Sequence, residues 1–265
     1  MRVAPQEDEA EPAAALPVLV ALRCTHDLDE TAAQALADCL DAEERRQAAR
    51  FAFAEDRRDY LVAHVLLRHA LSALEPCDPA AWVFARGPGG KPCLAGGGTL
   101  EFNLSHTRGW AACAVARGSA VGLDVERVRT DPDLPALARA HFSAEECVAL
   151  ERSGVTAQAA RFAELWSLKE AYAKGLGTGI GEGLPAVSFR LAAGGALECL
   201  DAGKALRRWQ FALCALPDAR LALAACAPVG GRIRMRVRTL DAARSASASG
   251  LRLLHASTGL TLEPG

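Results

Sequence analysis

The sequence predicts an α+β protein of two similar lobes, each a small, mainly antiparallel sheet packed on helices. Two observations predict this class. Short segments of alternating or continuous apolar residues mark strands, and longer segments with apolar residues at helical spacing lie between them. The order of these elements repeats along the chain, so the two lobes, at residues 15–118 and 119–230, are expected to be related by a pseudo-twofold axis.

The N-terminal lobe is expected to follow a disordered segment, because residues 1–14 are rich in Ala, Glu and Pro. Asp41 and Glu44 have the spacing of a capping box, which opens a helix that continues through Arg50. Apolar residues at helical spacing then predict a longer helix over residues 56–74. The strands of this lobe are expected at residues 17–23, 82–85, 100–104 and 110–115.

The C-terminal lobe is expected to repeat this order of elements. Its helices lie within residues 132–175. The last helix begins near Ala157 and ends at Lys174, because Gly175 and Gly177 then follow. The strands of this lobe are expected at residues 120–128, 186–191, 209–215 and 219–226.

Residues 231–265 are expected to form a C-terminal extension. Arg alternates with Ile, Met and Val over residues 232–239, which predicts a further strand with one basic face. The Ser- and Ala-rich residues 244–249 predict a flexible connector.

Charge and cysteine content narrow the class of protein. The formal net charge of -2 gives no overall basic field, so we expect no nucleic-acid partner. The nine cysteines are scattered and include no CxxC pair, which indicates small buried residues in a reducing compartment rather than a zinc site. The apolar run at residues 16–22 is too short for a signal peptide or a membrane span, so we expect a cytoplasmic protein without a membrane partner.

Two carboxylates share one face of the strand expected at residues 120–128. Asp124 and Glu126 are two positions apart and therefore point to the same side, while Val121, Leu123 and Val125 point to the other. Paired carboxylates suit a hard cation such as magnesium. An edge strand with a solvated acidic face explains the same pattern.

A third carboxylate and two lysines lie on the last predicted helix. Glu170 and Lys174 are one turn apart, and Lys169 precedes Glu170. The alternative to a functional role is an exposed ion pair, which stabilises a helix by about 0.3 kcal/mol, with Lys169 as a solvated surface residue.

Four ordered motifs resemble those of the 4'-phosphopantetheinyl transferases, specifically the larger single-chain, two-lobed type. Residues 122–126 (Gly-Leu-Asp-Val-Glu) and 166–174 (Trp-Ser-Leu-Lys-Glu-Ala-Tyr-Ala-Lys) hold a permitted residue at every position of the family's two main motifs. Residues 90–92 (Gly-Lys-Pro) and 102–107 (Phe-Asn-Leu-Ser-His-Thr) match its other two. The resemblance covers roughly residues 42–215, and the family's architecture supports the duplicated lobes.

The resemblance implies a reaction and a metal site. Members of the family transfer the 4'-phosphopantetheine group of coenzyme A to a serine of an apo acyl or peptidyl carrier protein, and they release adenosine 3',5'-bisphosphate. Carried over to this sequence, the magnesium ligands are Asp124, Glu126 and Glu170, while Lys174 lies near the pyrophosphate and stabilises or protonates the leaving group. The family also suggests a monomer with the ligand cleft between its lobes.

The catalytic base implied by the family is Glu146. Ser143 and Glu146 also have the spacing of a capping box, which would bind the carboxylate to a backbone N–H instead. Both interpretations stay open at this point.

Coenzyme A also carries a 3'-phosphate, for which the family uses basic residues together with a serine and a histidine. Ser105 and His106 hold those two positions here. At the position before Tyr60, where relatives often carry arginine, this chain has Asp59, which leaves the phosphate contacts in doubt. The basic candidates for binding coenzyme A are Lys91, Arg45, Arg46, Arg50 and Lys169, with Arg57 and Arg58 nearby, and a solvated basic face is the alternative for the arginines.

Two other functions compete with carrier-protein modification. One is a magnesium-dependent nucleotide phosphotransferase with a different acceptor, although the sequence lacks a Walker-type GxxxxGK[ST] motif. The other is a binder of carrier proteins that has lost the transfer reaction. The intact acidic motifs argue against this second function.

Overall fold

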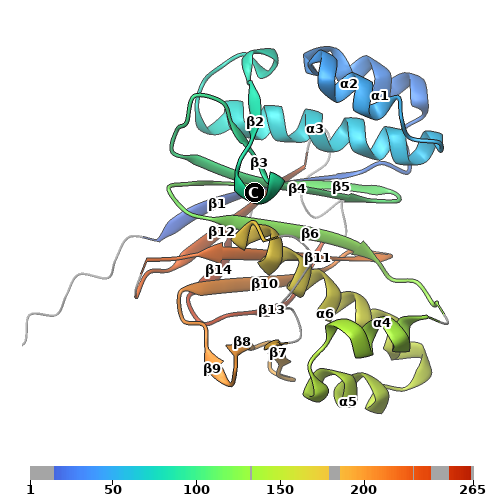
Figure 1. The fold of residues 1–265 in the computed structure, drawn as a ribbon, viewed down its shortest axis with the longest axis vertical. Helices are drawn as coiled ribbons and strands as arrows, with labels where there is room; N and C mark the ends of the chain where they lie inside the picture. The colour runs from blue at the N-terminus through green and yellow to red at the C-terminus, as the bar shows by residue number, and fades with distance from the viewer. Residues whose placement is uncertain (1–14, 132, 179–185, 229, 240–250, 264–265) are drawn as a thin grey trace, which may run out of the picture.

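The computed structural model describes residues 15–131, 133–178, 186–228, 230–239 and 251–263. Two sheets lie face to face, and each carries helices on its outer side (Figure 1). In Figure 1 the helices of the N-terminal half lie above the sheets, and those of the C-terminal half lie at the lower right. The expectations for residues 1–14 and 244–249 lie outside the described residues.

The first sheet has five strands in the order β14-β12-β1-β5-β4. They are β1 (Leu16–Cys24), β4 (Leu100–Thr107), β5 (Trp110–Arg117), β12 (Ile233–Thr239) and β14 (Leu260–Glu263). β1, β5 and β4 pair antiparallel, while β12 lies parallel to β1 and β14 parallel to β12. Strands from both ends of the chain therefore lie side by side in this sheet.

Three helices cover the outer face of the first sheet. They are α1 (Glu30–Leu36), α2 (Ala42–Ala48) and α3 (Ala54–Leu74), and a hairpin of β2 (Phe84–Arg86) and β3 (Pro92–Leu94) follows them. The predicted capping box of α2 is confirmed, because Asp41 accepts from the backbone N–H of Glu44 and Glu44 accepts from that of Asp41, each at 2.9 Å. No helix in the described ranges is long and apolar enough to cross a membrane.

The second sheet has four antiparallel strands in the order β13-β10-β11-β6. They are β6 (Val121–Arg127), β10 (Trp209–Ala215), β11 (Ala219–Cys226) and β13 (Arg252–Ala256). Its outer face carries α4 (Leu134–His141), α5 (Ala144–Arg152) and α6 (Val155–Leu176). A small separate sheet of β7 (Val187–Leu191), β8 (Leu197–Asp201) and β9 (Lys204–Ala205) packs beside these helices.

The α+β class and the two helix-covered lobes are confirmed. In the N-terminal half β5 lies between β1 and β4, and in the C-terminal half β11 lies between β6 and β10. Along the chain, the long helix α3 lies between β1 and β4, and the long helix α6 lies between β6 and β10. The short strands β3, β8, β9, β13 and β14 and the helix α1 were not predicted.

Alternation within the strands divides their apolar residues between separate cores. Val20 of β1 and Leu123 of β6 are fully buried between the two sheets. Leu19 of β1 packs against α3, and Ala222 of β11 packs against α6. Each strand therefore contributes to two cores, which fixes its register.

Of the two glycines predicted to end the last helix, Gly177 does so and Gly175 does not. α6 continues through Gly175 to Leu176 and ends at Gly177, whose φ of 75° is the left-handed conformation that favours glycine. A Cβ on Gly175 would lie 2.8 Å from the Trp209 ring. Gly175 therefore allows close packing between the helix and β10.

Candidate active site

The site lies where the edges of the two sheets meet, along β4 and β6. The Asn103 side chain Oδ1 accepts a hydrogen bond from the Leu123 N–H at 2.9 Å, and Ser105 Oγ accepts one from the Val125 N–H at 3.3 Å. Side chains of β4 therefore satisfy the backbone of β6 on its outer edge. This contact fixes the position of Asp124, which lies between those two residues of β6.

Close packing of α6 on β6 brings the two acidic motifs together. A Cβ on Gly122 would overlap the carbonyl oxygen of Ala171 and the backbone of Gly175, so only glycine permits this approach. Glu170 and Lys174 of α6 consequently lie beside Asp124 and Glu126 of β6. β6 is an edge strand, as one alternative held, but α6 covers its acidic face and Asp124 is only 5% exposed.

Asp124 has one oxygen with partners and one without. Its Oδ1 accepts hydrogen bonds from Ser105 Oγ at 2.9 Å and from Lys174 Nζ at 2.6 Å. Among the described residues, Asp124 Oδ2 and Glu170 Oε1 are buried and have no hydrogen-bond partner. Buried carboxylate oxygens are costly without a partner, so these two atoms indicate a ligand.

Burial and repulsion from Asp124 raise the pKa values of Glu126 and Glu170. Burial raises the pKa of Glu126 to about 7, and the negative charge of Asp124 adds to the rise. Burial likewise raises the pKa of Glu170 to about 7, again with Asp124 as the next cause. A cation among the three carboxylates would relieve this repulsion.

The donor set suits magnesium, which prefers carboxylate and water oxygens. The described residues nevertheless contain no ready-made cluster of three or more His, Cys, Asp or Glu side chains arranged for a metal. Lys174 Nζ instead lies against Asp124. The three carboxylates therefore suit magnesium chemically. In this structure the cation in contact with Asp124 is the Lys174 ammonium.

Glu146 and Lys169 form a second, separate buried pair. Lys169 Nζ lies 2.9 Å from Glu146 Oε2 and also donates to the Val187 carbonyl. Glu146 forms the capping box with Ser143 and accepts from the Phe189 N–H at 2.8 Å, so both of its oxygens are engaged. The capping alternative is thus the arrangement that the structure shows.

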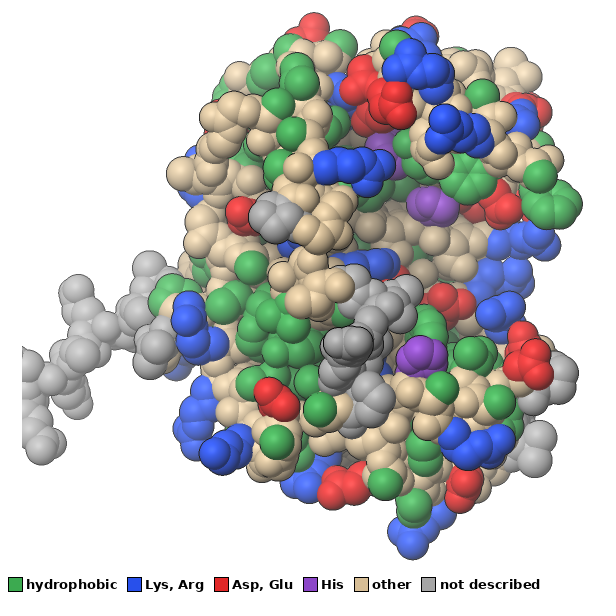
Figure 2. All heavy atoms as spheres, in the orientation of Figure 1, with side chains coloured by type: hydrophobic (Ala, Val, Ile, Leu, Met, Phe, Trp, Pro, Cys, Tyr) green, Lys and Arg blue, Asp and Glu red, His purple; other side chains and the backbone are tan. Residues whose placement is uncertain are grey.

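A cleft of about 380 Å³ opens beside Lys174. Figure 2 shows a hollow in the middle of this face, with histidine side chains on its upper side. The cleft is lined by His64, Gly89, Gly90, Lys91, Pro92, Asn103, Leu104, His106, Lys174 and Gly177. Both lobes contribute, and of the predicted residues Lys91, His106 and Lys174 are brought together here.

Lys91 fastens the Gly-Lys-Pro motif to the other lobe. Its Nζ donates to the carbonyls of Val121 at 3.1 Å and Gly175 at 3.3 Å. Burial lowers its pKa. A lysine at the end of α6 also complements the negative end of the helix dipole.

His106 lies in an aromatic corner of the cleft. Its ring lies 6.1 Å from that of Tyr60 and 6.2 Å from that of Phe51. Burial lowers the pKa of His106, and the neighbouring His64 contributes. Tyr60 and His64 were missed as site residues, although their spacing of four on a predicted helix places them on one face.

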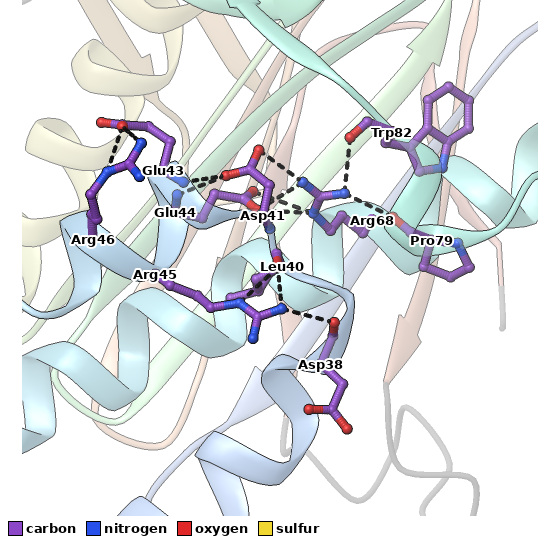
Figure 3. Close-up of polar contacts among 10 residues, drawn as sticks. All are labelled: Asp38, Leu40, Asp41, Glu43, Glu44, Arg45, Arg46, Arg68, Pro79 and Trp82. Atoms are coloured by element: carbon purple, nitrogen blue, oxygen red, sulfur yellow. Dashed lines mark hydrogen bonds and ion pairs between the residues drawn. The ribbon is translucent and has the colours of Figure 1, made fainter.

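Arg45 and Arg46 of α2, and Arg50 just after that helix, lie outside the cleft. Arg45 donates to the Leu40 carbonyl at 2.9 Å through Nε, Arg46 pairs with Glu43 at 2.6 Å, and Arg50 donates to Gln47 at 3.1 Å (Figure 3 shows the first two). All three arginines are exposed. The structure therefore does not bring them to the other predicted site residues.

α2 and its N-cap Asp41 line a second hollow of about 350 Å³, which shares His64, Pro92 and Leu104 with the cleft. The α2 side of this hollow carries carboxylates and an amide, namely Asp41, Glu43, Glu44 and Gln47. Figure 3 shows Asp41 and Glu44 directed at Arg68, which is fully buried.

Asp59 has a structural role. It is 1% exposed and accepts hydrogen bonds from Thr25 Oγ1, from the Gly109 N–H at 3.0 Å and from Arg58 Nε at 3.0 Å. Arg57 pairs with Glu30 at 2.5 Å. Neither Arg57 nor Arg58 lines the cleft.

Comparison with known proteins matches both lobes to one superfamily. Residues 120–226 match the 4'-phosphopantetheinyl transferase superfamily, and residues 29–117 match the N-terminal domain of a 4'-phosphopantetheinyl transferase. The two matches together include every motif residue of the site.

Full-length relatives agree with these matches. The chain is 36% identical over 153 residues to the 4'-phosphopantetheinyl transferase psf-1 of Bacillus pumilus, covering 58% of this chain and 64% of the relative. It is 35% identical over 176 residues to a phosphopantetheinyl transferase of Thraustochytrium, covering 61% of each. The 4'-phosphopantetheinyl transferase HetI of Nostoc is 35% identical over 158 residues, covering 58% of this chain and 66% of the relative.

The chain thus spans less than two thirds of the length of each of these relatives. The two family matches occupy both lobes, and the motif residues Ser105, Asp124 and Lys174 contact one another where β4, β6 and α6 meet. This chain belongs to the 4'-phosphopantetheinyl transferase superfamily.

Proposed function

We propose that this protein transfers the 4'-phosphopantetheine group of coenzyme A to a serine of an apo acyl or peptidyl carrier protein. The observation that carries the proposal is the position of Asp124, which has an unpartnered oxygen and lies against Lys174 at the edge of a two-lobed cleft. The relatives, which are named as transferases of this group, support the choice of substrate.

Asp124, Glu126 and Glu170 would hold a magnesium ion. When bound, the ion would supply charge neutralisation at the pyrophosphate of coenzyme A. The two unpartnered oxygens, Asp124 Oδ2 and Glu170 Oε1, support this assignment. Ser105 orients Asp124 through its hydroxyl while it also accepts the Val125 N–H.

The remaining cleft residues would bind and orient coenzyme A. Lys174 can donate its ammonium protons to a phosphate oxygen and stabilise the leaving group. Lys91 and His106 line the same cleft and are assigned to coenzyme A. Glu146 and Lys169 are left out of this site because they are buried against each other, and Arg45, Arg46 and Arg50 are left out because they lie away from the cleft.

We also infer a reducing, cytoplasmic setting and a monomer. All nine cysteines are free thiols in the structure, and several are buried in the cores. The two lobes already enclose the cleft, so a second copy is not needed to form it.

Mass spectrometry of the carrier protein tests the function. Purified protein is incubated with coenzyme A, magnesium and an apo carrier, and the carrier should gain the mass of one phosphopantetheine on its conserved acceptor serine. A carrier that binds but keeps its mass would support the noncatalytic binder. Phosphorylation of another acceptor, with no change in any carrier, would support the nucleotide phosphotransferase.

A further inference from the structure

We propose that Lys174 is the counter-ion of the metal-free site, and that it competes with the metal for Asp124. The inference deepens the proposed function, because it concerns how the same site exchanges one cation for another. The resemblance stated above places Lys174 near the pyrophosphate. The structure points to an additional contact with a metal ligand.

The contact between Lys174 and Asp124 is short and shielded. Lys174 Nζ lies 2.6 Å from Asp124 Oδ1 and 3.1 Å from Ser105 Oγ. The Asp124 side chain is 7% exposed and that of Lys174 is 29% exposed. Solvent screens such a pair less than a surface ion pair, so the ammonium is held at this oxygen.

One ammonium cannot satisfy all the carboxylates. Asp124 Oδ2 and Glu170 Oε1 remain without partners among the described residues. A divalent cation can accept several carboxylate oxygens at once, but it would be repelled by an ammonium bound to the same Asp124 group. The ammonium at Asp124 Oδ1 therefore weakens metal binding, and the metal binds more tightly once Lys174 leaves Asp124.

The cleft gives the released ammonium a place to go. Lys174 lines the 380 Å³ cleft together with Lys91 and His106, and this is where an anionic phosphate ligand would bind. A phosphate that draws Lys174 from Asp124 opens the carboxylate to the metal. Binding of the two ligands is then coupled, and the coupling is reciprocal.

Direct metal binding without coenzyme A tests the proposal. The probe is Mn²⁺, which takes the same oxygen ligands as magnesium and whose free concentration can be read by electron paramagnetic resonance. Lys174→Met should bind Mn²⁺ about tenfold more tightly than wild type, which corresponds to about 1.4 kcal/mol. If Lys174 served only phosphate, its loss would leave the Mn²⁺ affinity of the ligand-free protein unchanged.

Lys204→Met is the control. Lys204 is an exposed lysine of β9 and is not among the residues that line the cleft. Its Mn²⁺ affinity should stay within about twofold of wild type. Equal affinity in wild type and Lys174→Met overturns the proposal, as does equal tightening in both variants or no Mn²⁺ binding in any of the three proteins.

A second measurement needs no variant. Mn²⁺ should increase the acetylation of Lys174 in the wild-type protein relative to Lys91, because the released amine becomes accessible, and peptide mass mapping reads both sites. Unchanged acetylation of Lys174 at saturating Mn²⁺ counts against the proposal. Neither measurement involves transfer, so a protein that behaves as expected here yet fails to modify any carrier contradicts only the proposed function.

Discussion

Asp124 is the residue on which the proposed chemistry depends most. Asp124→Asn keeps the size of the side chain but removes its charge, so the fold should persist while metal binding fails. Transfer to the carrier should fall by about 100-fold or more, since a metal contributes several kcal/mol of charge stabilisation. Carrier mass spectrometry measures the rate, and circular dichroism checks the fold. Asp27→Asn, which removes an aspartate paired with Arg23 on the surface, is the control. Near wild-type turnover in Asp124→Asn would refute the metal assignment.

Glu126 and Glu170 make the stability of the metal-free protein depend on pH. Their folded-state pKa values of about 7 lie above the ordinary carboxyl value of about 4.3. The folded protein therefore binds more protons between these values than the unfolded chain. The stability that the two groups contribute is complete below about pH 4 and is lost as the pH rises through about 7.

Glu170→Gln removes one of these groups and should flatten the pH profile. In the presence of a chelator, urea unfolding from about pH 5 to about pH 8 should show a smaller fall in the free energy of unfolding than wild type. Glu145→Gln, at an exposed glutamate paired with Arg190, should keep the wild-type slope. Parallel profiles for Glu170→Gln and wild type would contradict the expectation.

Individual residues show how far the sequence could predict the site. The common direction of Asp124 and Glu126 follows from the period of a strand and could be predicted. The contact of Lys174 with Asp124 could not, because it joins two elements whose distance apart depends on Gly122 and on packing. His64 was missed because a single histidine on a helix carries no signal until the opposite wall of the cleft is known.

At the scale of elements, the pair of Glu146 and Lys169 joins α5, α6 and β7. Glu146→Gln removes the charge that offsets the buried ammonium and should cost about 3 to 5 kcal/mol of unfolding free energy. Adding Lys169→Met removes the ammonium as well and should recover at least half of that loss. Urea unfolding measures both variants.

Transfer by the same double variant separates a structural role from catalysis. If Glu146 only holds the elements together, turnover should return with stability. A double variant that is stable but inactive would support the catalytic base implied by the family resemblance. Glu145→Gln serves again as a control, because it alters the neighbouring exposed carboxylate of α5.

Strong periodic patterns predicted most elements, and packing decided the exceptions. The alternation over residues 232–239 predicted β12 correctly, with its arginines on the exposed face. It could not show that β12 lies parallel to β1 inside the first sheet. Gly175 was misplaced because a glycine that ends a helix and one that admits a neighbouring ring look alike in a sequence.

At the scale of the whole molecule, the two lobes share one core and should unfold together. Apolar residues of both sheets fill the space between the sheets. β12 contributes Met235, which is fully buried there. This packing joins strands from both ends of the described chain to β6, which carries Asp124. Loss of the shared core should therefore weaken both lobes rather than release one of them.

Met235→Ala tests this shared core. The truncation should cost about 2 to 5 kcal/mol, because it leaves a cavity between the sheets. Tryptophan fluorescence and circular dichroism should report one coincident transition in urea, shifted to a lower midpoint. Arg236→Ala, one residue along the same strand, removes only an exposed ion pair with Glu263 and should change stability by less than about 1 kcal/mol. Two separate transitions in Met235→Ala would show that each lobe folds on its own and would contradict the shared core.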